Sequence, residues 1–336
     1  MYKRIISILL CLLMVSGMAL CLCSCKDDNS DEYPVTVANV TIQSEPKNIT
    51  VLSDCLADII SYMGYDVKMV GRSAEVDQEF LSVVPTVGTA ASPDVNAIIN
   101  NETDLVITET ALPDNVTTAL SDASIPVLTL SRAKSFDELE ALYVNLGTAL
   151  GGNVTGRKQG QDSYKSLTKT LGDFKNAIPK DAVKTACYLY LNENNELCTL
   201  TKGSIEYELF SYNGAINVFS SQETPLVDLS VLKISTPSFI FYNDQAVLDY
   251  LKNDTELSTM GALNNDKTYQ VKLVDFGRQG TTYEEIAYRM LEFMFITSAA
   301  TPDEATPDEA TSATESETQT ASEEETVVGF ISDVEE

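Results

Sequence analysis

The sequence predicts an α/β protein with two Rossmann-like lobes, joined by one long helix, and a ligand cleft between the lobes. Short β-rich runs alternate with amphipathic helical runs through the middle of the 336-residue chain, the pattern of doubly wound sheets. The alternation stops once, at the long polar stretch GRKQGQDSYKSLTKTLGDFKNAI, and then resumes. About 250 residues lie between the two unusual ends of the chain, enough for two lobes of roughly a hundred residues each. A cleft between two such lobes is a common place for a ligand.

The chain begins with the layout of a secretory signal. In MYKRIISILLCLLMVSGMAL, Lys3 and Arg4 precede an uncharged apolar run. The run is short and lies at the N-terminus, which favours an export signal over a membrane span. We expect residues 1–24 to be a lipoprotein signal peptide that is removed from the mature protein.

Three cysteines alternate at the end of this signal, in LCLCSCKDD, and only Cys25 is expected to remain. The segment Leu22-Cys23-Ser24-Cys25 fits the bacterial lipoprotein pattern Leu-x-(Ala/Gly/Ser)-Cys. Cys21 and Cys23 each follow a leucine, which is too large for the residue before a cleavage site. We therefore predict that Cys25 is the first mature residue and carries lipid on its sulfur. The protein would be extracytoplasmic, attached to the outer face of the cell membrane through the lipid anchor only.

The first lobe is predicted over residues 46–152, after a flexible tether over residues 25–45 that leads into an edge strand or loop. The strand DLVIT is apolar throughout, as expected for a strand buried on both faces of a parallel sheet. The helices have apolar residues at every third or fourth position, as in DCLADIISYMG. The predicted order is strand NITVLS, helix DCLADIISYMG, strand DVKMVG, helix PDVNAIINNE, strand DLVIT, strand IPVLTL and helix SFDELEALYVNLGTALGG.

The long polar stretch predicts the bridging helix, over residues 153–180, and the alternation then resumes in a second lobe over residues 181–297. The helix is expected to end before Pro179, which cannot continue it. The second lobe is predicted as the strand pair KTACYLYLNENNELCTL, helix SIEYELFSYNG, strand SFIFYN, helix QAVLDYLKN, strand TYQVKLV and helix TYEEIAYRMLEFMF.

Two cysteines flank the Asn-rich turn of that strand pair, and they form a possible disulfide. If the hairpin closes at Asn192-Glu193, then Cys187 and Cys198 face each other across it. A disulfide between them is compatible with a location outside the cell. The alternative is two half-buried free thiols, and the sequence leaves both open.

The C-terminal residues 298–336 predict a disordered acidic tail. TPDEA occurs twice in tandem, and the segment from Ala299 onward has twelve acidic residues and no basic one. Such a segment cannot bury enough apolar surface to offset the entropy lost on ordering. Its last apolar stretch, VVGFI, could instead act as a docking peptide.

Composition excludes several classes of function. The net charge of −28 makes a nucleic-acid partner improbable, because DNA and RNA are polyanions. The chain has no histidine, which removes the commonest zinc ligand and the commonest general base. A serine hydrolase, a zinc hydrolase and a histidine-ligated haem are therefore disfavoured. Gly-x-Ser-x-Gly is also absent, so we expect no enzyme, no catalytic residue and no protein-bound metal.

Several blocks of sequence resemble one family, the substrate-binding proteins of ABC importers for iron–siderophores, haem and cobalamin (the class III, helical-backbone periplasmic binding proteins). The opening PKNITVLSDCLADIISYMGYDVKMVGRS and the next block VPTVGTAASPDVNAIINNETDLVIT resemble the family's first two blocks in order and spacing. GAINV and FGRQGTTYEEIA resemble late blocks, so the likeness spans residues 46–296.

The resemblance implies two lobes bridged by a rigid helix, the architecture that the residue pattern predicts independently. It implies that the protein captures a metal chelate (a siderophore, haem or corrinoid) outside the membrane and delivers it to an ABC permease. No chemistry is done on the ligand, and no cofactor is needed beyond the chelate itself. We expect a monomer.

Ligand-binding residues are predicted at the carboxyl ends of the strands, where ligands bind in open α/β sheets. Glycines there let the backbone approach a ligand, and arginines can hold carboxylates through two hydrogen bonds. Each arginine has the alternative of being an ordinary surface residue. In the first lobe the predicted residues are Ser53, Asp54, Cys55, Arg72, Gly88, Thr89, Glu109, Thr110 and Arg132, and in the second lobe they are Lys202, Gly203, Tyr242, Asn243, Arg278 and Gln279.

Cys55 has two interpretations. It falls in the first turn of a predicted helix, where the helix N-terminus lowers a thiol pKa and could make it a soft metal ligand. We favour the alternative, a small buried residue that packs against the sheet.

The chain departs from the family at two positions. Family members usually have one glutamate on each lobe that docks onto an arginine of the permease, and the corresponding positions here are Asn96 and Ser230. Either the neighbouring carboxylates substitute for the glutamates, or the docking surface differs. This departure favours a second hypothesis, a ligand-binding surface lipoprotein uncoupled from transport, which would act as a scavenger or interaction module.

Overall fold

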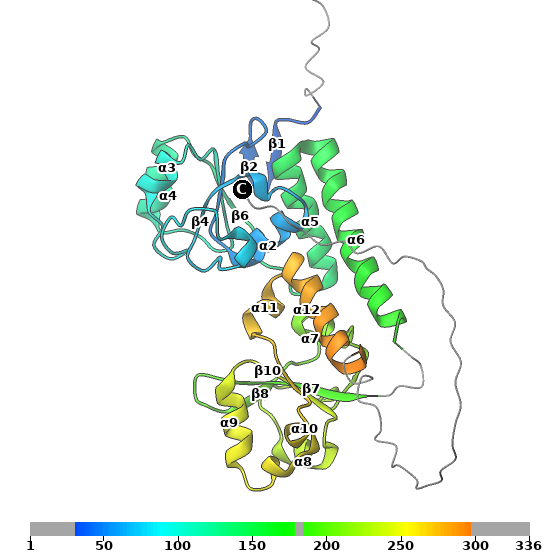
Figure 1. Cartoon of the computed structure of the whole chain (residues 1–336). Helices are drawn as coiled ribbons and strands as arrows, with labels where there is room; N and C mark the ends of the chain where they lie inside the picture. The colour runs from blue at the N-terminus through cyan, green and yellow to red at the C-terminus, as the bar shows by residue number, and fades with distance from the viewer. Residues whose placement is uncertain (1–30, 179–183, 297–336) are drawn as a thin grey trace, which may run out of the picture. The chain divides into compact units, whose positions relative to one another are not determined.

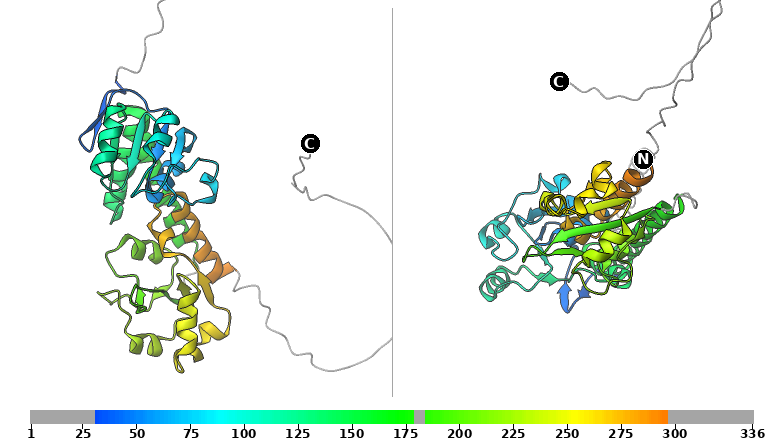
Figure 2. Two further views of the ribbon diagram at one scale, coloured as in Figure 1. Left: turned by 90° about the vertical axis from the view of Figure 1, so that its left-hand side faces the viewer. Right: turned by 90° about the horizontal axis from the view of Figure 1, so that it is seen from below.

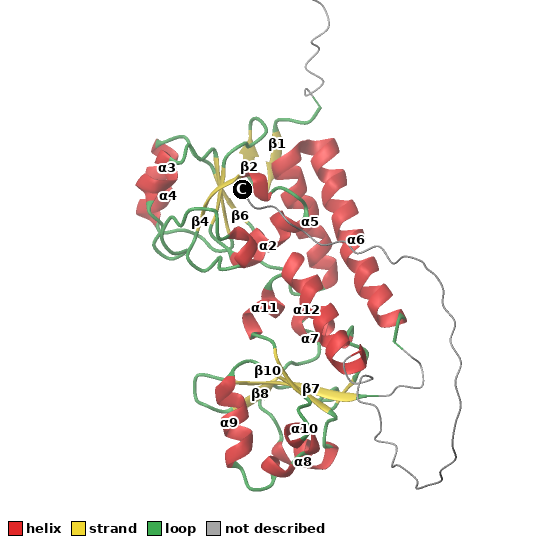
Figure 3. Cartoon of the chain, viewed as in Figure 1, coloured by secondary structure: helices red, strands yellow, loops and turns green. Residues whose placement is uncertain are grey.

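Two β-sheets, each flanked by helices, form the two lobes of a computed structural model that describes residues 31–178 and 184–296 (Figure 1). Figure 3 shows the strands of each lobe lying between layers of helices. The predicted α/β class and two-lobe architecture are therefore confirmed. The signal peptide, Cys25 and the acidic tail lie outside the described residues.

The sheet of the first lobe is parallel, with strand order β4-β3-β5-β6. Alternate residues face two cores: Val51 and Ile107 pack with helices α2 and α5, and Leu52 and Val106 pack with α3 and α4. The elements are β3 (Ile49–Val51), α2 (Asp54–Tyr62), η1 (Asp66–Lys68), β4 (Met69–Arg72), η2 (Glu79–Leu81), α3 (Val95–Asn100), β5 (Leu105–Thr108), α4 (Asp114–Asp122), β6 (Val127–Thr129) and α5 (Phe136–Gly151).

A β-hairpin precedes this lobe, and it corrects the predicted extent of the tether. Strands β1 (Val35–Val37) and β2 (Val40–Ile42) pair in an antiparallel manner. The side chains of Val35, Val37 and Ile42 are buried in the main core. Three buried aliphatic side chains fix this segment to the lobe, so a flexible connection from residue 25 to residue 45 is wrong for its second half.

Helices α5 and α6 (Arg157–Asn176) pack against each other and are joined by a tight π-helical turn, η3 (Gly152–Gly156). Three glycines allow the close approach: a Cβ on Gly147 would meet the carbonyl oxygen of Gly156, and one on Gly160 would meet that of Tyr143. Helix α6 then runs toward the second lobe, as predicted for the bridging helix (Figure 1).

The second lobe has a sheet of order β11-β10-β7-β8, with the short β9 also paired to β7. Different helices cover its two faces. Ile240 packs on one face, in the core of α8 to α10, and Phe241 packs on the other, in the main core with α7 and η5. The elements are β7 (Thr185–Leu191), β8 (Leu197–Thr199), α7 (Ile205–Ser211), β9 (Ile216–Asn217), α8 (Leu229–Ser235), β10 (Phe239–Tyr242), α9 (Gln245–Asn253), η4 (Leu257–Thr259), α10 (Gly261–Asn264), β11 (Thr268–Gln270), α11 (Leu273–Gly277), α12 (Thr281–Leu291) and η5 (Glu292–Ile296).

The main hydrophobic core is continuous between the lobes. It contains Ile107 from the first sheet, Tyr143 from α5, Tyr283 from α12 and Phe241 from the second sheet. Helix α12, orange in Figures 1 and 2, lies beside α6 and contacts both α2 and α7. The lobes are therefore joined by packed side chains as well as by the chain itself.

The possible disulfide between Cys187 and Cys198 is wrong in this structure, where both thiols are free and buried. The hairpin register pairs Cys198 with Tyr190, so Cys187 lies three residues away on the opposite face of β7. The turn is centred on Asn194 instead of between Asn192 and Glu193, with Asn195 in the left-handed conformation. The pairing register therefore shifts by three residues, an odd number, which leaves the two cysteines on opposite faces of the sheet.

No helix in residues 31–178 and 184–296 combines the length and the apolar character that a membrane crossing requires.

Candidate functional site

The segment that connects α11 to α12 is tied to the first lobe by buried hydrogen bonds. The Gln279 side chain donates to the Ala133 carbonyl (2.7 Å) and accepts from the Ala133 amide (3.0 Å). The Tyr143 hydroxyl donates to the Gln279 carbonyl at 2.8 Å. We call this segment, residues 277–282, the clasp.

A buried carboxylate completes the clasp. Asp58, in α2, accepts hydrogen bonds from the amides of Gly280 (2.8 Å) and Thr282 and from the Thr282 hydroxyl (2.7 Å). These donors belong to the first turn of α12, so Asp58 satisfies free amides at a helix N-terminus. Burial raises the pKa of Asp58 above its usual range, although the three hydrogen bonds oppose that rise.

A charge network lies beside the clasp, at the carboxyl ends of the strands. The Arg132 guanidinium holds Glu109 through two hydrogen bonds, Nε to Oε1 at 2.6 Å and Nη2 to Oε2 at 2.9 Å. It also contacts Asp54 Oδ1 at 3.2 Å and the Gly277 carbonyl at 3.5 Å. Ser53 also donates to Glu109 Oε2, at 3.0 Å. This side of the network joins strand ends of the first lobe to the clasp.

These contacts determine the direction in which the pKa values of Glu109 and Arg132 are shifted. Burial raises the pKa of Glu109, but the hydrogen bonds and charge of Arg132 outweigh it, so the pKa lies below its usual range. The hydrogen bond to Glu109 raises the pKa of Arg132. Both groups are therefore charged at neutral pH.

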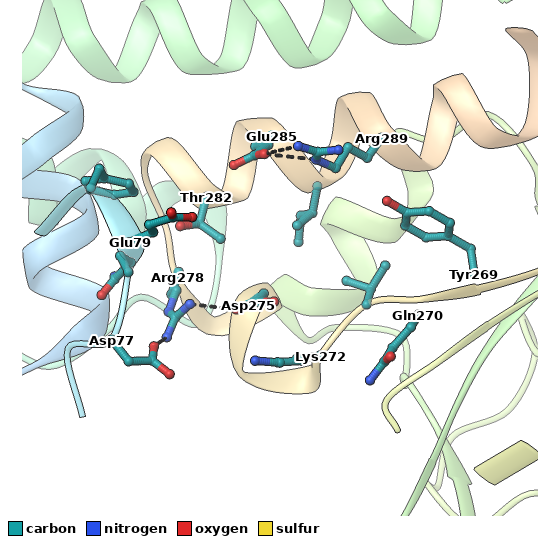
Figure 4. Close-up of a pocket in the computed structure, with 14 residues that line it drawn as sticks. Asp77, Glu79, Tyr269, Gln270, Lys272, Asp275, Arg278, Thr282, Glu285 and Arg289 are labelled. Atoms are coloured by element: carbon teal, nitrogen blue, oxygen red, sulfur yellow. Dashed lines mark hydrogen bonds and ion pairs between the residues drawn. The ribbon is translucent and has the colours of Figure 1, made fainter. Parts of the chain in front are cut away.

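Arg278 forms the second half of the network. Its side chain is only 8% exposed and pairs with Asp275 (Nη1 to Oδ1, 2.7 Å) and with Asp77 from the first lobe. Its Nε lies 3.6 Å from Asp54 Oδ2. Figure 4 shows Arg278 between Asp77 and Asp275. Burial raises the pKa of Asp275, and the Arg278 charge partly offsets the rise.

A cavity of about 670 Å³ lies against this side of the network, with walls from both lobes. The first lobe contributes the segment after β4, and the second lobe contributes the end of β11, α11 and the side of α12 (Figure 4). Its lining residues include Asp77, Gln78, Glu79, Phe80, Tyr269, Lys272, Asp275, Arg278, Glu285 and Arg289.

The structure brings together five of the residues predicted for ligand binding. Ser53, Asp54, Glu109, Arg132 and Arg278 form the network, and Arg278 also lines the cavity. Thr110, Lys202 and Gly203 are exposed on loops after strands, with Gly203 in the left-handed conformation.

Other predicted residues have structural partners. Arg72 donates to the carbonyls of Val84 (2.9 Å) and Val76 (2.5 Å), which fixes its own loop. Asn243 accepts from the Leu273 amide at 2.7 Å, and Gln279 is fully buried in the clasp. Gly88 and Thr89 form a turn, and Tyr242 is half-buried at the end of β10.

Cys55 is fully buried in the main core. Burial raises the pKa of its thiol well above the usual range, which disfavours the thiolate that a metal ligand requires. No group of three histidine, cysteine, aspartate or glutamate side chains in the described part of the chain is arranged to hold a metal ion.

Most of the cavity wall was not predicted from the sequence. Asp77, Gln78 and Glu79 follow β4 by five to seven residues, beyond the strand end where ligand residues are expected. Lys272 and Asp275 lie in TYQVKLVDF, of which only Thr268–Gln270 is a strand. The acidic character of VDQE was the available signal.

The two positions compared with docking glutamates are both exposed and occupy equivalent places. Asn96 and Ser230 are each the second residue of a helix, α3 and α8, that begins after a capping aspartate. Asp94 accepts from the Ala97 amide at 3.1 Å, and Asp228 accepts from the Ser230 amide at 2.9 Å. The carboxylates nearest to the two positions therefore serve as helix caps.

Comparison with known proteins found similarity in both sequence and fold, while no family model matches the chain. The chain is 25% identical over 254 residues to the uncharacterized ABC transporter substrate-binding lipoprotein YvrC of Bacillus subtilis, covering 72% of this chain and 79% of that protein. The periplasmic haem-binding protein HutB of Vibrio cholerae has the same fold, with a TM-score of 0.61 at 14% identity over 74% of this chain and 98% of that structure. A possible iron-binding periplasmic solute-binding protein of Staphylococcus epidermidis gives a TM-score of 0.59 at 15% identity, over 75% and 100% of the two chains.

Proposed function

We propose that this chain, a class III periplasmic binding protein by its fold and a homologue of an ABC transporter substrate-binding lipoprotein, captures a metal chelate outside the membrane for import. The chelate would be a siderophore, haem or a corrinoid. The relatives named above are binding proteins, in agreement with the prediction that this chain is not an enzyme.

The cavity between the lobes is the observation that carries this proposal. Its volume, about 670 Å³, is within the range of small-molecule sites in proteins. Its walls come from the segment that follows β4 and from the carboxyl-terminal end of β11, on the side of open α/β sheets where ligands bind. Charged and aromatic side chains line it, which suits an organic chelate better than a bare ion.

The site of action would be the outer face of the cell membrane, with Cys25 acylated. This follows from the signal sequence, and the similar Bacillus subtilis protein is named a lipoprotein. The partner would be an ABC permease, which receives the chelate from the cleft.

The test is to purify the detergent-solubilised lipoprotein from cells grown with several chelates and to analyse it by native mass spectrometry. We expect a mass increment near one equivalent that contains iron or cobalt and disappears on denaturation. A well-folded protein that never carries a chelate, and that binds none when titrated, would contradict the proposal.

A second candidate is a surface lipoprotein that binds the same class of ligand but does not feed a permease. Asn96 and Ser230 favour it, because neither can form an ion pair with a permease arginine. The two candidates differ in one measurable property, the stimulation of importer ATPase activity by the loaded protein.

A further inference from the structure

We propose that the cavity between the lobes selects a chelate of zero or positive net charge and rejects polyanionic chelates. This inference rests on the proposed function, because it specifies the substrate class of the same cavity. It depends on the charges and hydrogen-bond partners of the cavity wall.

The two arginines nearest the ligand space are already neutralised. Arg132 directs all three of its nitrogens to protein oxygens, those of Glu109, Asp54 and Gly277. Arg278 contacts three carboxylates, those of Asp54, Asp77 and Asp275. The Nε of Arg278 has no hydrogen-bond partner, but it is buried, 3.6 Å from Asp54 Oδ2, so neither guanidinium offers an exposed edge with two free donors to a ligand carboxylate.

Carboxylates outnumber cations across the network and the cavity wall. The carboxylates are those of Asp54, Asp77, Glu79, Glu109, Asp275 and Glu285, and the cations are Arg132, Lys272, Arg278 and Arg289. Arg289 pairs with Glu285 at 2.7 Å. Lys272 makes no ion pair in the part of the chain that the structure describes, so it is the lining cation most open to an anion.

An anionic ligand that binds Arg278 would have to displace a carboxylate from it. The Arg278 and Asp54 side chains are 8% and 11% exposed, so breaking their pairing would leave charge with little access to water. That cost is large for buried charges. In contrast, the Asp77 side chain is 60% exposed, so its oxygens are open to a cationic group.

A buried hydrogen-bond acceptor on the cavity wall also favours a ligand that carries N–H or O–H donors. The Gln78 side chain is 4% exposed, and its Oε1 has no hydrogen-bond partner. Its Nε2 donates to the Asp54 carbonyl at 2.9 Å, and a flipped amide would place two oxygens together, so this orientation is fixed. Gln78 lines the cavity, so the wall contains a buried and unused acceptor, which a ligand N–H or O–H group would satisfy after a small displacement of the side chain.

The test compares two ferric chelates of opposite charge, ferrioxamine B, a cationic trihydroxamate, and a ferric tris-catecholate trianion. Calorimetric titration of the detergent-solubilised full chain should show tighter binding of the cation. The preference should shrink as salt is raised, because part of the network is exposed to solvent.

Asp77→Asn should reduce the ratio of the two affinities by about fivefold, the upper end of what an exposed charge pair contributes. Asp162→Asn is the matched control, since the Asp162 side chain is 53% exposed, pairs with Lys158, and lies outside the cavity. The control should leave the ratio unchanged.

Tighter binding of the trianion, or of haemin with its two propionates, overturns this inference and leaves the proposed function intact. An equal effect of Asp77→Asn and Asp162→Asn also overturns it, because net charge rather than the cavity wall would then set the preference. If the folded chain binds none of these chelates, the proposed function fails and the inference fails with it.

Discussion

At the scale of single residues, Arg132 is the side chain on which the polar contacts of the first lobe's strand ends converge. It draws Glu109 from the end of β5 and Asp54 from the start of α2 to one point. Because the Arg132 and Glu109 side chains are 34% and 22% exposed, their pairing is partly screened by water.

Replacing Glu109 with Gln should lower the free energy of unfolding at pH 7 by about 1–2 kcal/mol, an amount between the values of exposed and buried pairs. The folded pKa of Glu109 is depressed, so its contribution is fully present above the unfolded pKa, about 4.3. It is lost as the pH falls through the lower folded pKa. Urea unfolding of both proteins at pH 7 and pH 3 measures this difference.

The control is Asp173→Asn, which removes an exposed pair with Lys169 and should cost less than about 0.5 kcal/mol at either pH. A difference between wild type and Glu109→Gln that stays constant from pH 7 to pH 3 would show that Glu109 does not stabilise the fold through its charge.

Cys25 gives a second prediction at this scale. Cys25→Ala should abolish acylation and move the protein from the membrane fraction to the soluble fraction, because the sulfur that would carry the lipid is lost. Cys21→Ala and Cys23→Ala should leave acylation unchanged. Fatty-acid labelling followed by fractionation measures both effects, and a labelled, membrane-bound Cys25→Ala protein would refute the assignment.

Residue types and strand ends were enough to select five residues that the structure brings together in one network, and their contact with a ligand stays a prediction. These are Ser53, Asp54, Glu109, Arg132 and Arg278. The roles of Arg72 and Gln279 could not be predicted, because both bond to backbone atoms that tertiary packing alone brings near. The cavity acids Asp77 and Glu79 were not predicted because they lie five and seven residues after β4, where no strand end marks them.

At the scale of elements, periodicity predicted the long helices and the buried strands well and short irregular pieces poorly. DLVIT is a buried strand and the amphipathic run after Ser135 is α5, as expected. TYQVKLV was predicted as one strand, yet it is a short strand followed by α11, because apolar alternation over a few residues fits either structure. The register of the β7–β8 hairpin was missed for a related reason, since several Asn-rich turn positions were equally plausible.

Helices α3 and α8 give the prediction that belongs to this scale. Asn96→Glu together with Ser230→Glu should restore carboxylates to the exposed second residue of each helix. Close carboxylate–arginine pairs steer association and fix register at an interface. We expect the double variant to gain stimulation of ATPase activity in a related importer that keeps its arginines.

The control adds the same two charges at the other ends of the same helices, Asn100→Glu with Ser235→Glu, and should gain nothing. Strong stimulation by the unmodified protein would mean that Asp94 and Asp228 substitute for the missing glutamates despite their capping role.

At the scale of the whole two-lobe unit, the connection between lobes predicts how far they can move. The sequence predicted a bridging helix without a loop hinge, and the structure adds the clasp and a shared core. These could not be predicted because Asp58 and Gln279 act on partners more than a hundred residues away.

We therefore expect only a small closure when a chelate binds. Separation of the lobes would break the Gln279–Ala133 and Asp58–Gly280 hydrogen bonds and expose Tyr143 and Tyr283, which lie in the shared core. Each buried group left unpaired costs about 1–3 kcal/mol, so such opening is rare at equilibrium. Hinged domains joined by flexible strands lack this resistance. X-ray scattering profiles with and without the chelate should nearly superpose.

The variant Gln279→Ala removes both hydrogen bonds between Gln279 and Ala133. It therefore tests directly whether the clasp limits the movement of the lobes. It should lower the free energy of unfolding by about 2 kcal/mol and make the radius of gyration respond more to ligand. Thr255→Ala, an exposed change distant from the clasp, should do neither. A clear fall in the radius of gyration of the unmodified protein on binding would contradict this account. It would show that the clasp is open in the unbound protein, because an intact clasp fixes the distance between the lobes in both states.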